Sequence, residues 1–138
     1  MEKGKREKIL VVDDEAAVLN ILSERLESIG YDSNTETDGL RALHRIKGTH
    51  YDLVLLDINM PYLCGTEILK GLKRVDLNTP VVKVSGLDSI AIVRKTLREG
   101  AYDYLVKPLD FDDLELTIKR ALEHGRLLQR NCRMLAMP

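Results

Sequence analysis

The sequence contains no tryptophan and a single phenylalanine, so it offers few aromatic rings on which nucleic-acid bases could stack. Its formal net charge is -1, which provides no excess of basic side chains for phosphate contacts. Together, these two features argue against direct binding of nucleic acid.

Cysteine and long apolar runs are also scarce. Cys64 and Cys132 lie far apart without the spacing of zinc ligands, which favours two free thiols in a reducing compartment. The charged N-terminus is followed by only four apolar residues, Ile9–Val12, too few for the core of a signal peptide. No run is long enough to span a bilayer. We therefore expect a cytoplasmic protein without membrane contact.

What the sequence does contain is a set of short apolar runs that each end on a polar group. With 138 residues, 44% of them hydrophobic, the chain suits one globular domain. The runs and the groups that follow them are Ile9–Val12 before Asp13-Asp14, Leu53–Leu56 before Asp57, Val81–Val84 before Ser85, and Tyr104–Val106 before Lys107-Pro108. If these runs are parallel strands, their polar ends meet at one edge of a sheet.

Apolar residues at helical spacing fill the intervals between the runs. We expect five helices: one after Asp14, one capped by Asp38, one preceded by Gly65, one capped by Asp88 or Ser89, and one capped by Asp110. The polar segment 31–37 is expected to be an edge strand. Strands alternating with helices predict an α/β fold: a doubly wound, five-stranded parallel sheet with helices on both faces. The flavodoxin-like order 2-1-3-4-5 puts the polar strand at an edge.

In this order Asp13, Asp14 and Asp57 lie at the point where the strand order reverses, which is where such sheets bind ligands. Clustered carboxylates repel one another unless a cation joins them, and an open set of oxygen ligands suits Mg²⁺. A simpler interpretation is that Asp13 and Asp14 only cap the following helix. That interpretation leaves the third acid and the lysine unexplained.

Asp57 can serve as a metal ligand or as a nucleophile that forms an acyl phosphate. Phosphoryl transfer requires charge neutralisation more than acid-base catalysis. The Lys107 ammonium and the Ser85 hydroxyl would supply donors for phosphoryl oxygens. The pattern therefore predicts a site for phosphate chemistry.

These residues resemble the receiver domain of bacterial two-component response regulators over roughly residues 8–122. The matching motifs are Ile9–Glu15, Asp57-Ile58-Asn59-Met60-Pro61 with Gly65, and Gly100–Pro108. The resemblance implies that Asp57 accepts a phosphoryl group from a sensor histidine kinase or a phosphotransfer protein. It implies a self-modifying signalling switch rather than an enzyme.

The resemblance also assigns roles within the site. Asp14 and Asp57 would bind Mg²⁺ directly, Asp13 through a water and Asn59 through its backbone carbonyl, with Mn²⁺ as a substitute. Ser85 and Lys107 would hold the phosphoryl oxygens, Tyr104 would turn inward on switching, and Lys107-Pro108 would be a cis bond. A homodimer through the fourth helix, fifth strand and fifth helix is a further expectation.

Lys83 departs from the family, because it stands inside a strand that is normally apolar. It lies two residues before Ser85, so both side chains point to the same face of the sheet. From there its charge could act near the site.

The expected organisation is an N-terminal tail at 1–7, the receiver at 8–124, and an extended final helix or linker at 125–138. An apolar stripe continuing past the receiver favours a helix leading to an output domain that this chain lacks. Gly125 could equally end that helix.

Two alternatives share parts of this pattern. A metal-dependent phosphatase with an aspartyl nucleophile would normally carry a second Asp at the position of Asn59. A degenerate receiver that acts only as a binding module would not need the intact set of acids, Ser85 and Lys107. A dinucleotide-binding domain is disfavoured, because Asp13-Asp14-Glu15 replaces the glycine-rich loop and would repel a pyrophosphate.

Overall fold

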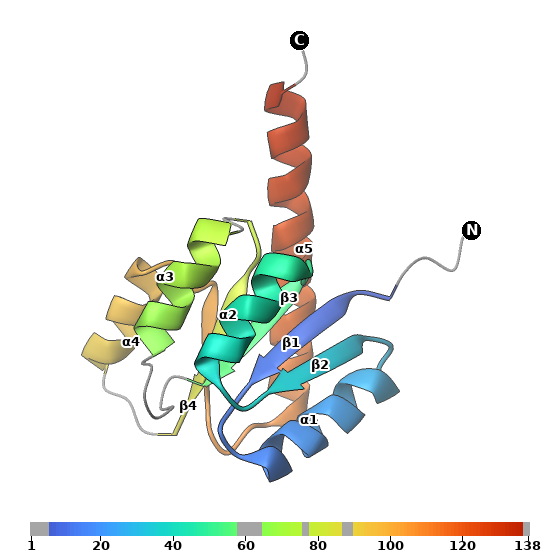
Figure 1. Cartoon of the computed structure of the whole chain (residues 1–138), viewed down its shortest axis with the longest axis vertical. Helices are drawn as coiled ribbons and strands as arrows, with labels where there is room; N and C mark the ends of the chain where they lie inside the picture. The colour runs from blue at the N-terminus through green and yellow to red at the C-terminus, as the bar shows by residue number, and fades with distance from the viewer. Residues whose placement is uncertain (1–5, 58–64, 76–77, 87–89, 137–138) are drawn as a thin grey trace.

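The computed structural model describes residues 6–57, 65–75, 78–86 and 90–136, in which strands and helices alternate as predicted (Figure 1). In chain order the elements are β1 (Lys8–Val12), α1 (Ala16–Ser28), β2 (Asp32–Glu36), α2 (Gly39–Gly48), β3 (Leu53–Asp57), α3 (Gly65–Val75), β4 (Val81–Ser85), α4 (Ile90–Arg98), β5 (Asp103–Val106) and α5 (Phe111–Ala136). None of these helices has the length and hydropathy needed to cross a membrane.

The sheet is parallel throughout and has the predicted order β2-β1-β3-β4-β5. The polar strand β2 pairs only with β1 among the described strands, so it forms one edge. Its polar side chains are tolerated there because an edge strand is less deeply buried than the apolar centre. β1 and β3 are neighbours, which brings the ends of two acid-terminated strands together.

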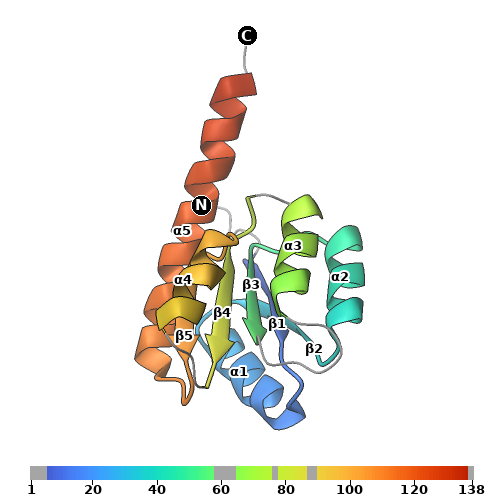
Figure 2. The same cartoon turned by 90° about the vertical axis from the view of Figure 1, so that its left-hand side faces the viewer.

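Two hydrophobic cores hold the helices against the sheet. One lies between the sheet and helices α2 and α3, and the other between the sheet and helices α1 and α5. Figure 2 shows α2 and α3 on one side of the sheet and α5 on the other. Strand side chains alternate between the two cores: Val54 and Leu56 join the first, whereas Leu53 and Leu55 join the second.

Aspartates cap two of the helices as the sequence predicted. The Asp38 carboxylate accepts a hydrogen bond from the Leu40 backbone N–H at 2.9 Å, at the start of α2. Asp110 accepts from the backbone N–H groups of Asp112 and Asp113 at the start of α5. Each cap satisfies donors that the first turn of a helix leaves unpaired. The alternative caps of α4, Asp88 and Ser89, lie outside the described residues.

Helix α5 passes through Gly125 and continues to Ala136, so it extends well beyond the sheet (Figure 1). Gly125 is buried against Pro80: a methyl group placed on it would lie 3.2 Å from the Pro80 Cδ atom. Beside it, Arg126 forms an ion pair with Glu7 at 2.7 Å, which joins α5 to the segment that leads into β1. The helix therefore does not end at Gly125, whereas the boundary of the receiver at residue 124 stays a prediction.

Candidate functional site

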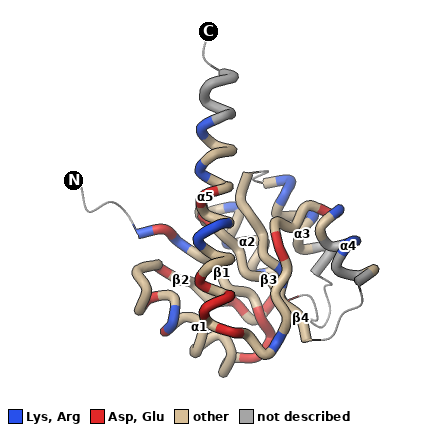
Figure 3. The backbone as a smooth tube through the Cα atoms, turned by 180° about the vertical axis from the view of Figure 1, so that it is seen from behind, with Lys and Arg blue, Asp and Glu red and all other residues tan. Residues whose placement is uncertain are grey.

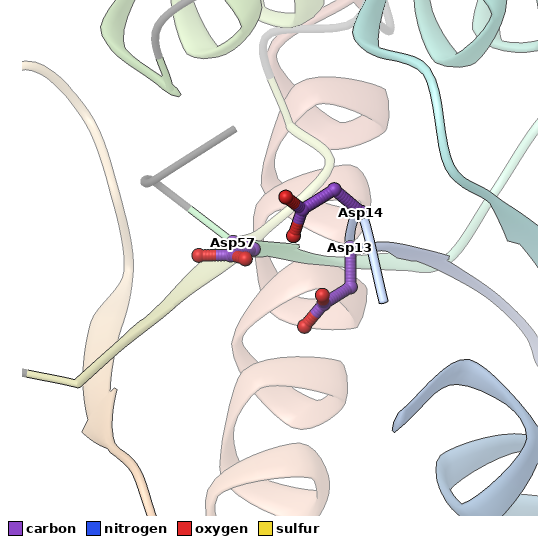
Figure 4. Close-up of side chains that lie close together, drawn as sticks. All are labelled: Asp13, Asp14 and Asp57. Carbon is purple, nitrogen blue, oxygen red and sulfur yellow. The ribbon is translucent and has the colours of Figure 1, made fainter. Parts of the chain in front are cut away.

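Three carboxylates meet at the carboxyl edge of the sheet, between β1 and β3. One oxygen each of Asp13, Asp14 and Asp57 lies within 4.8 Å of the others. Figure 4 shows the three side chains gathered at the ends of their strands. Asp13 and Asp57 are buried, with 3% and 4% exposure, whereas Asp14 is open to solvent. The cluster therefore has two buried members and an accessible side.

Lys107 places a positive charge against the two buried acids. Its Nζ lies 3.0 Å from Asp13 Oδ2 and 3.5 Å from Asp57 Oδ2. Partial burial of the ammonium acts to lower the pKa of Lys107, but the hydrogen bond to Asp13 and the charges of Asp13 and Asp57 outweigh it. The pKa of Lys107 is therefore raised, and the side chain is held in its charged form beside Asp57.

Asp13 also shapes the turn that follows β1. Its Oδ1 atom accepts a hydrogen bond from the Glu15 backbone N–H at 2.9 Å, while Oδ2 faces Lys107. Glu15 is the residue that precedes α1, and its side chain makes no capping hydrogen bond. Asp13 thus bonds both to the turn before α1 and to Lys107. A capping role for Asp13 does not explain its contact with Lys107.

Ser85 and Lys107 end adjacent strands. Ser85 is fully buried at the end of β4, and its backbone carbonyl accepts a hydrogen bond from the Lys107 N–H at 2.8 Å. By strand alternation, Ser85 lies on the face of the sheet covered by α2 and α3. Asp13, Asp57 and Lys107 continue the opposite face, covered by α1 and α5. The hydroxyl and the ammonium therefore approach the edge from opposite sides of the sheet.

Tyr104 lies on β5 on the same face as Ser85. Its hydroxyl oxygen is buried and has no hydrogen-bond partner within the described part of the chain. The Lys107-Pro108 peptide bond that follows is cis, as the resemblance implied. Asn59, the remaining predicted metal ligand, lies outside the described residues.

The hollow beside the acids is lined by apolar side chains. The sequence pattern did not mark them as part of a site. Val18 and Leu22 come from α1 and Leu109 from the segment after β5, next to Asp13, Asp57 and Lys107. The helical spacing of Val18 and Leu22 indicates only a core-facing stripe. No local pattern distinguishes a core position from the wall of a site.

The arrangement fits a small, hard divalent cation. Carboxylate oxygens from separate strands converge, and the exposed Asp14 leaves one side open to water and to a phosphate. Mg²⁺ is commonly bound through one or two carboxylates while it keeps several waters. Asp13, Asp14 and Asp57 are the described residues that could hold it.

Comparison with known proteins agrees with this arrangement. The family model of the response regulator receiver domain matches residues 9–119. The transcriptional regulatory protein ZraR of Klebsiella oxytoca is 41% identical over 124 residues, which cover 90% of this chain and 28% of ZraR. The regulatory protein AtoC of Escherichia coli (strain K12) is 37% identical over 116 residues, 84% of this chain and 25% of AtoC. The chain thus spans about a quarter of the length of these relatives.

Solved structures show the same fold. A CheY-like response regulator receiver domain protein from Methanospirillum hungatei JF-1 has a TM-score of 0.84 and 30% identity, covering 88% of this chain and 98% of that one. NtrX from Brucella abortus has a TM-score of 0.87 and 33% identity, covering 94% of this chain and 30% of NtrX. The predicted resemblance is confirmed: the chain belongs to the response regulator receiver domain family of two-component systems.

Proposed function

We propose that this receiver accepts a phosphoryl group on Asp57 in a Mg²⁺-dependent reaction and changes conformation to regulate an output domain or a separate partner. The observation that carries the proposal is the buried Asp57 carboxylate, which belongs to the cluster of three acids and lies 3.5 Å from the Lys107 ammonium. The donor would be a phosphohistidine of a sensor histidine kinase or a phosphotransfer protein.

In the proposed step, one Asp57 carboxylate oxygen attacks the phosphorus. The new P–O bond forms as the P–N bond to the donor histidine breaks, and the imidazole nitrogen keeps the bonding electron pair. Asp13, Asp14 and Asp57 would hold Mg²⁺, and the ion would neutralise charge on the phosphoryl oxygens. Asn59 would add its backbone carbonyl, which stays a prediction.

Lys107 and Ser85 would then respond to the new group. Modification of Asp57 moves its negative charge outward onto the phosphoryl oxygens, and the Lys107 ammonium, already 3.5 Å from Asp57 Oδ2, can follow that charge. Ser85 would donate its hydroxyl from the other face of the sheet. Because Ser85 and Tyr104 share a face, a movement of the first favours a new position of the second.

Helix α4, strand β5 and helix α5 are the proposed output surface and the proposed homodimer interface. Val106, Leu116 and Leu127 are exposed there. Figure 3 shows basic and acidic positions interleaved along α5, a mixture that suits pairing between two copies. Sedimentation of the protein with and without a phosphoryl donor tests this proposal.

The cytoplasmic location expected from the sequence also stays a prediction.

Intact mass spectrometry after incubation with Mg²⁺ and acetyl phosphate tests the central proposal. We expect one added phosphoryl group in the wild type. No addition is expected in Asp57→Asn or after removal of Mg²⁺ with a chelator. Asp112→Asn is the matched control, because Asp112 is an exposed acid on α5 and should leave labelling unchanged.

The other outcomes separate the alternatives. Repeated turnover of varied phosphate esters would instead support the phosphatase. Absence of both an adduct and Mg²⁺ affinity would leave the degenerate receiver that acts only as a binding module.

A further inference from the structure

Lys83 is a buried lysine in the interior of the sheet. It lies in the middle of β4 with 1% exposure, and it is one of the largest fully buried side chains among the described residues. Its neighbours in the strand, Val82 and Val84, are apolar. A methionine would fill similar space without bringing an ammonium out of water, so packing alone does not explain a lysine here.

The position of Lys83 relates it to the switch residues. It shares the α2–α3 face with Ser85, two residues along the same strand. Across the ladder, Lys83 pairs in register with Tyr104 of β5, so those two side chains leave the sheet side by side on one face. Neighbouring parallel strands lie about 4.8 Å apart, a spacing at which two long side chains can meet at their tips.

The Tyr104 hydroxyl is a buried polar group near Lys83 in the ladder. Its oxygen is inaccessible to solvent and forms no hydrogen bond with any described residue. A buried hydroxyl without a partner is unfavourable, so an arrangement that supplies a partner is stabilised relative to this one. An ammonium carries three N–H donors, and Lys83 can therefore bond to Tyr104 while it keeps other contacts.

We propose that Lys83 is a positioning residue of the switch, whose ammonium donates a hydrogen bond to the Tyr104 hydroxyl in the phosphorylated arrangement. This inference rests on the proposed function. The bond exists in one arrangement and is absent from the other. Because the bond stabilises only the phosphorylated arrangement, it helps phosphorylation to shift the protein from one conformation to the other. Lys83 thereby couples β4, where Ser85 senses the phosphoryl group, to β5, where Tyr104 carries the signal outward.

A double-mutant cycle tests the coupling. The variants are Lys83→Met, Tyr104→Phe and the two combined, with Tyr102→Phe as a control that removes a hydroxyl from a tyrosine packed against the other core. The measurement is the affinity for beryllium fluoride, a phosphoryl mimic, in the presence of Mg²⁺. We expect each single variant to lose roughly tenfold in affinity, the size of one hydrogen bond to a charged group, and the double variant to lose no more.

A second measurement distinguishes a switch role from a merely structural one. Without beryllium fluoride, Tyr104→Phe should not lower stability, because the hydroxyl forms no hydrogen bond with the described residues. Lys83→Arg, which keeps a charged donor, should retain most of the affinity. Two results would overturn the inference. One is a loss of affinity in the double variant equal to the product of the two single losses, and the other is a loss of stability in the unbound Tyr104→Phe protein as large as its loss of binding free energy.

The result stays decisive if Lys83→Met does not fold. Tyr104→Phe alone must weaken beryllium fluoride binding, and unchanged binding contradicts the inference without any Lys83 variant. Failure of the proposed function is separately visible, since the wild type would then gain no phosphoryl mass on Asp57. A wild type that is labelled on Asp57, combined with independent effects of the two variants, rejects the role of Lys83 only.

Discussion

At the scale of single residues, the site is organised around one positive charge between buried negative ones. Lys107 contacts both Asp13 and Asp57, and only Asp14 of the three acids is exposed. Removing the ammonium would leave two buried carboxylates close together without the positive charge that both of them contact. A bound divalent cation would supply the missing charge. Stability and metal binding should therefore be linked through this lysine.

The first prediction concerns Lys107→Met. Because the side chain keeps 24% exposure, we expect the free energy of unfolding to fall by roughly 1–3 kcal/mol rather than by the larger amount of a fully buried pair. Adding Mg²⁺ should restore more stability to the variant than to the wild type. Urea titrations with and without Mg²⁺ measure both effects. Lys119→Met, at an exposed lysine on α5, is the control, and an equal loss there would contradict the prediction.

The second prediction follows from the raised pKa of Lys107. A basic group whose pKa is higher in the folded protein contributes its full stabilisation at pH values below its pKa in the unfolded chain, about 10.4. That stabilisation is lost as the pH rises through the pKa of the folded protein. The difference in unfolding free energy between the wild type and Lys107→Met should therefore be constant at lower pH and shrink above about pH 10.4. Urea titrations between about pH 8 and pH 11 test it. A difference that grows with alkalinity would have the wrong sign.

At the scale of secondary structure, α5 combines packing with extension. Its first turns bury Leu114, Ile118 and Leu122 against the sheet. Gly125 then allows the helix to pass close to Pro80, where a larger residue would meet the proline ring. Glycine costs a helix interior about 1 kcal/mol relative to alanine, so its presence here is explained by that close approach rather than by helix propensity.

The third prediction compares two glycines. In Gly125→Ala the new methyl group would lie 3.2 Å from Cδ of Pro80, whose ring is stiff and buried. We expect the gain in helix propensity to be cancelled or exceeded, with a change between about 0 and 1 kcal/mol toward lower stability. Gly48→Ala, at the end of α2 with no described atom within 4 Å of the new methyl group, should instead gain about 0.5 kcal/mol. Thermal and urea unfolding would reveal whether the two variants differ in sign.

At the scale of the whole molecule, the sheet brings distant parts of the chain into one site. Lys107 and Asp13 are 94 positions apart in the sequence, yet their side chains are hydrogen bonded. Strand β3 lies between β1 and β4, so Asp57 occupies the centre of that edge. Two cores on opposite faces hold the strands in this order. The site therefore exists only in the complete fold.

The fourth prediction tests the expected domain boundary. A chain ending at residue 124 keeps Leu114, Ile118 and Leu122 but loses the Arg126–Glu7 ion pair, which is largely exposed. Such pairs contribute about 0–1 kcal/mol, so we expect this chain to unfold cooperatively and to take a phosphoryl group on Asp57. A chain ending at residue 113 loses the buried face of α5 and should not fold. Circular dichroism and intact mass distinguish them, and an unfolded 124-residue chain would move the boundary into the extension.

The fold and much of the site could be predicted because their signals are local. Apolar runs marked β1, β3, β4 and β5, and their order predicted a parallel sheet whose polar ends share an edge. The cap at Asp38 and the edge position of β2 were also predicted correctly. In each case the signal lies in a short stretch of sequence, because the spacing of apolar residues indicates the type of element and a cap bonds to backbone groups two or three residues away.

Only the tertiary structure decided which residues far apart in the sequence are in contact. The sequence could not establish that Lys107 contacts both Asp13 and Asp57, or that Gly125 lies against Pro80. Nor could it pair Lys83 with Tyr104. The sequence by itself determined the elements and the chemical groups at their ends, because periodicity reports which face of an element is apolar. Which of those groups touch was decided by strand register and by the packing of helices on both faces, which join residues that no local pattern relates.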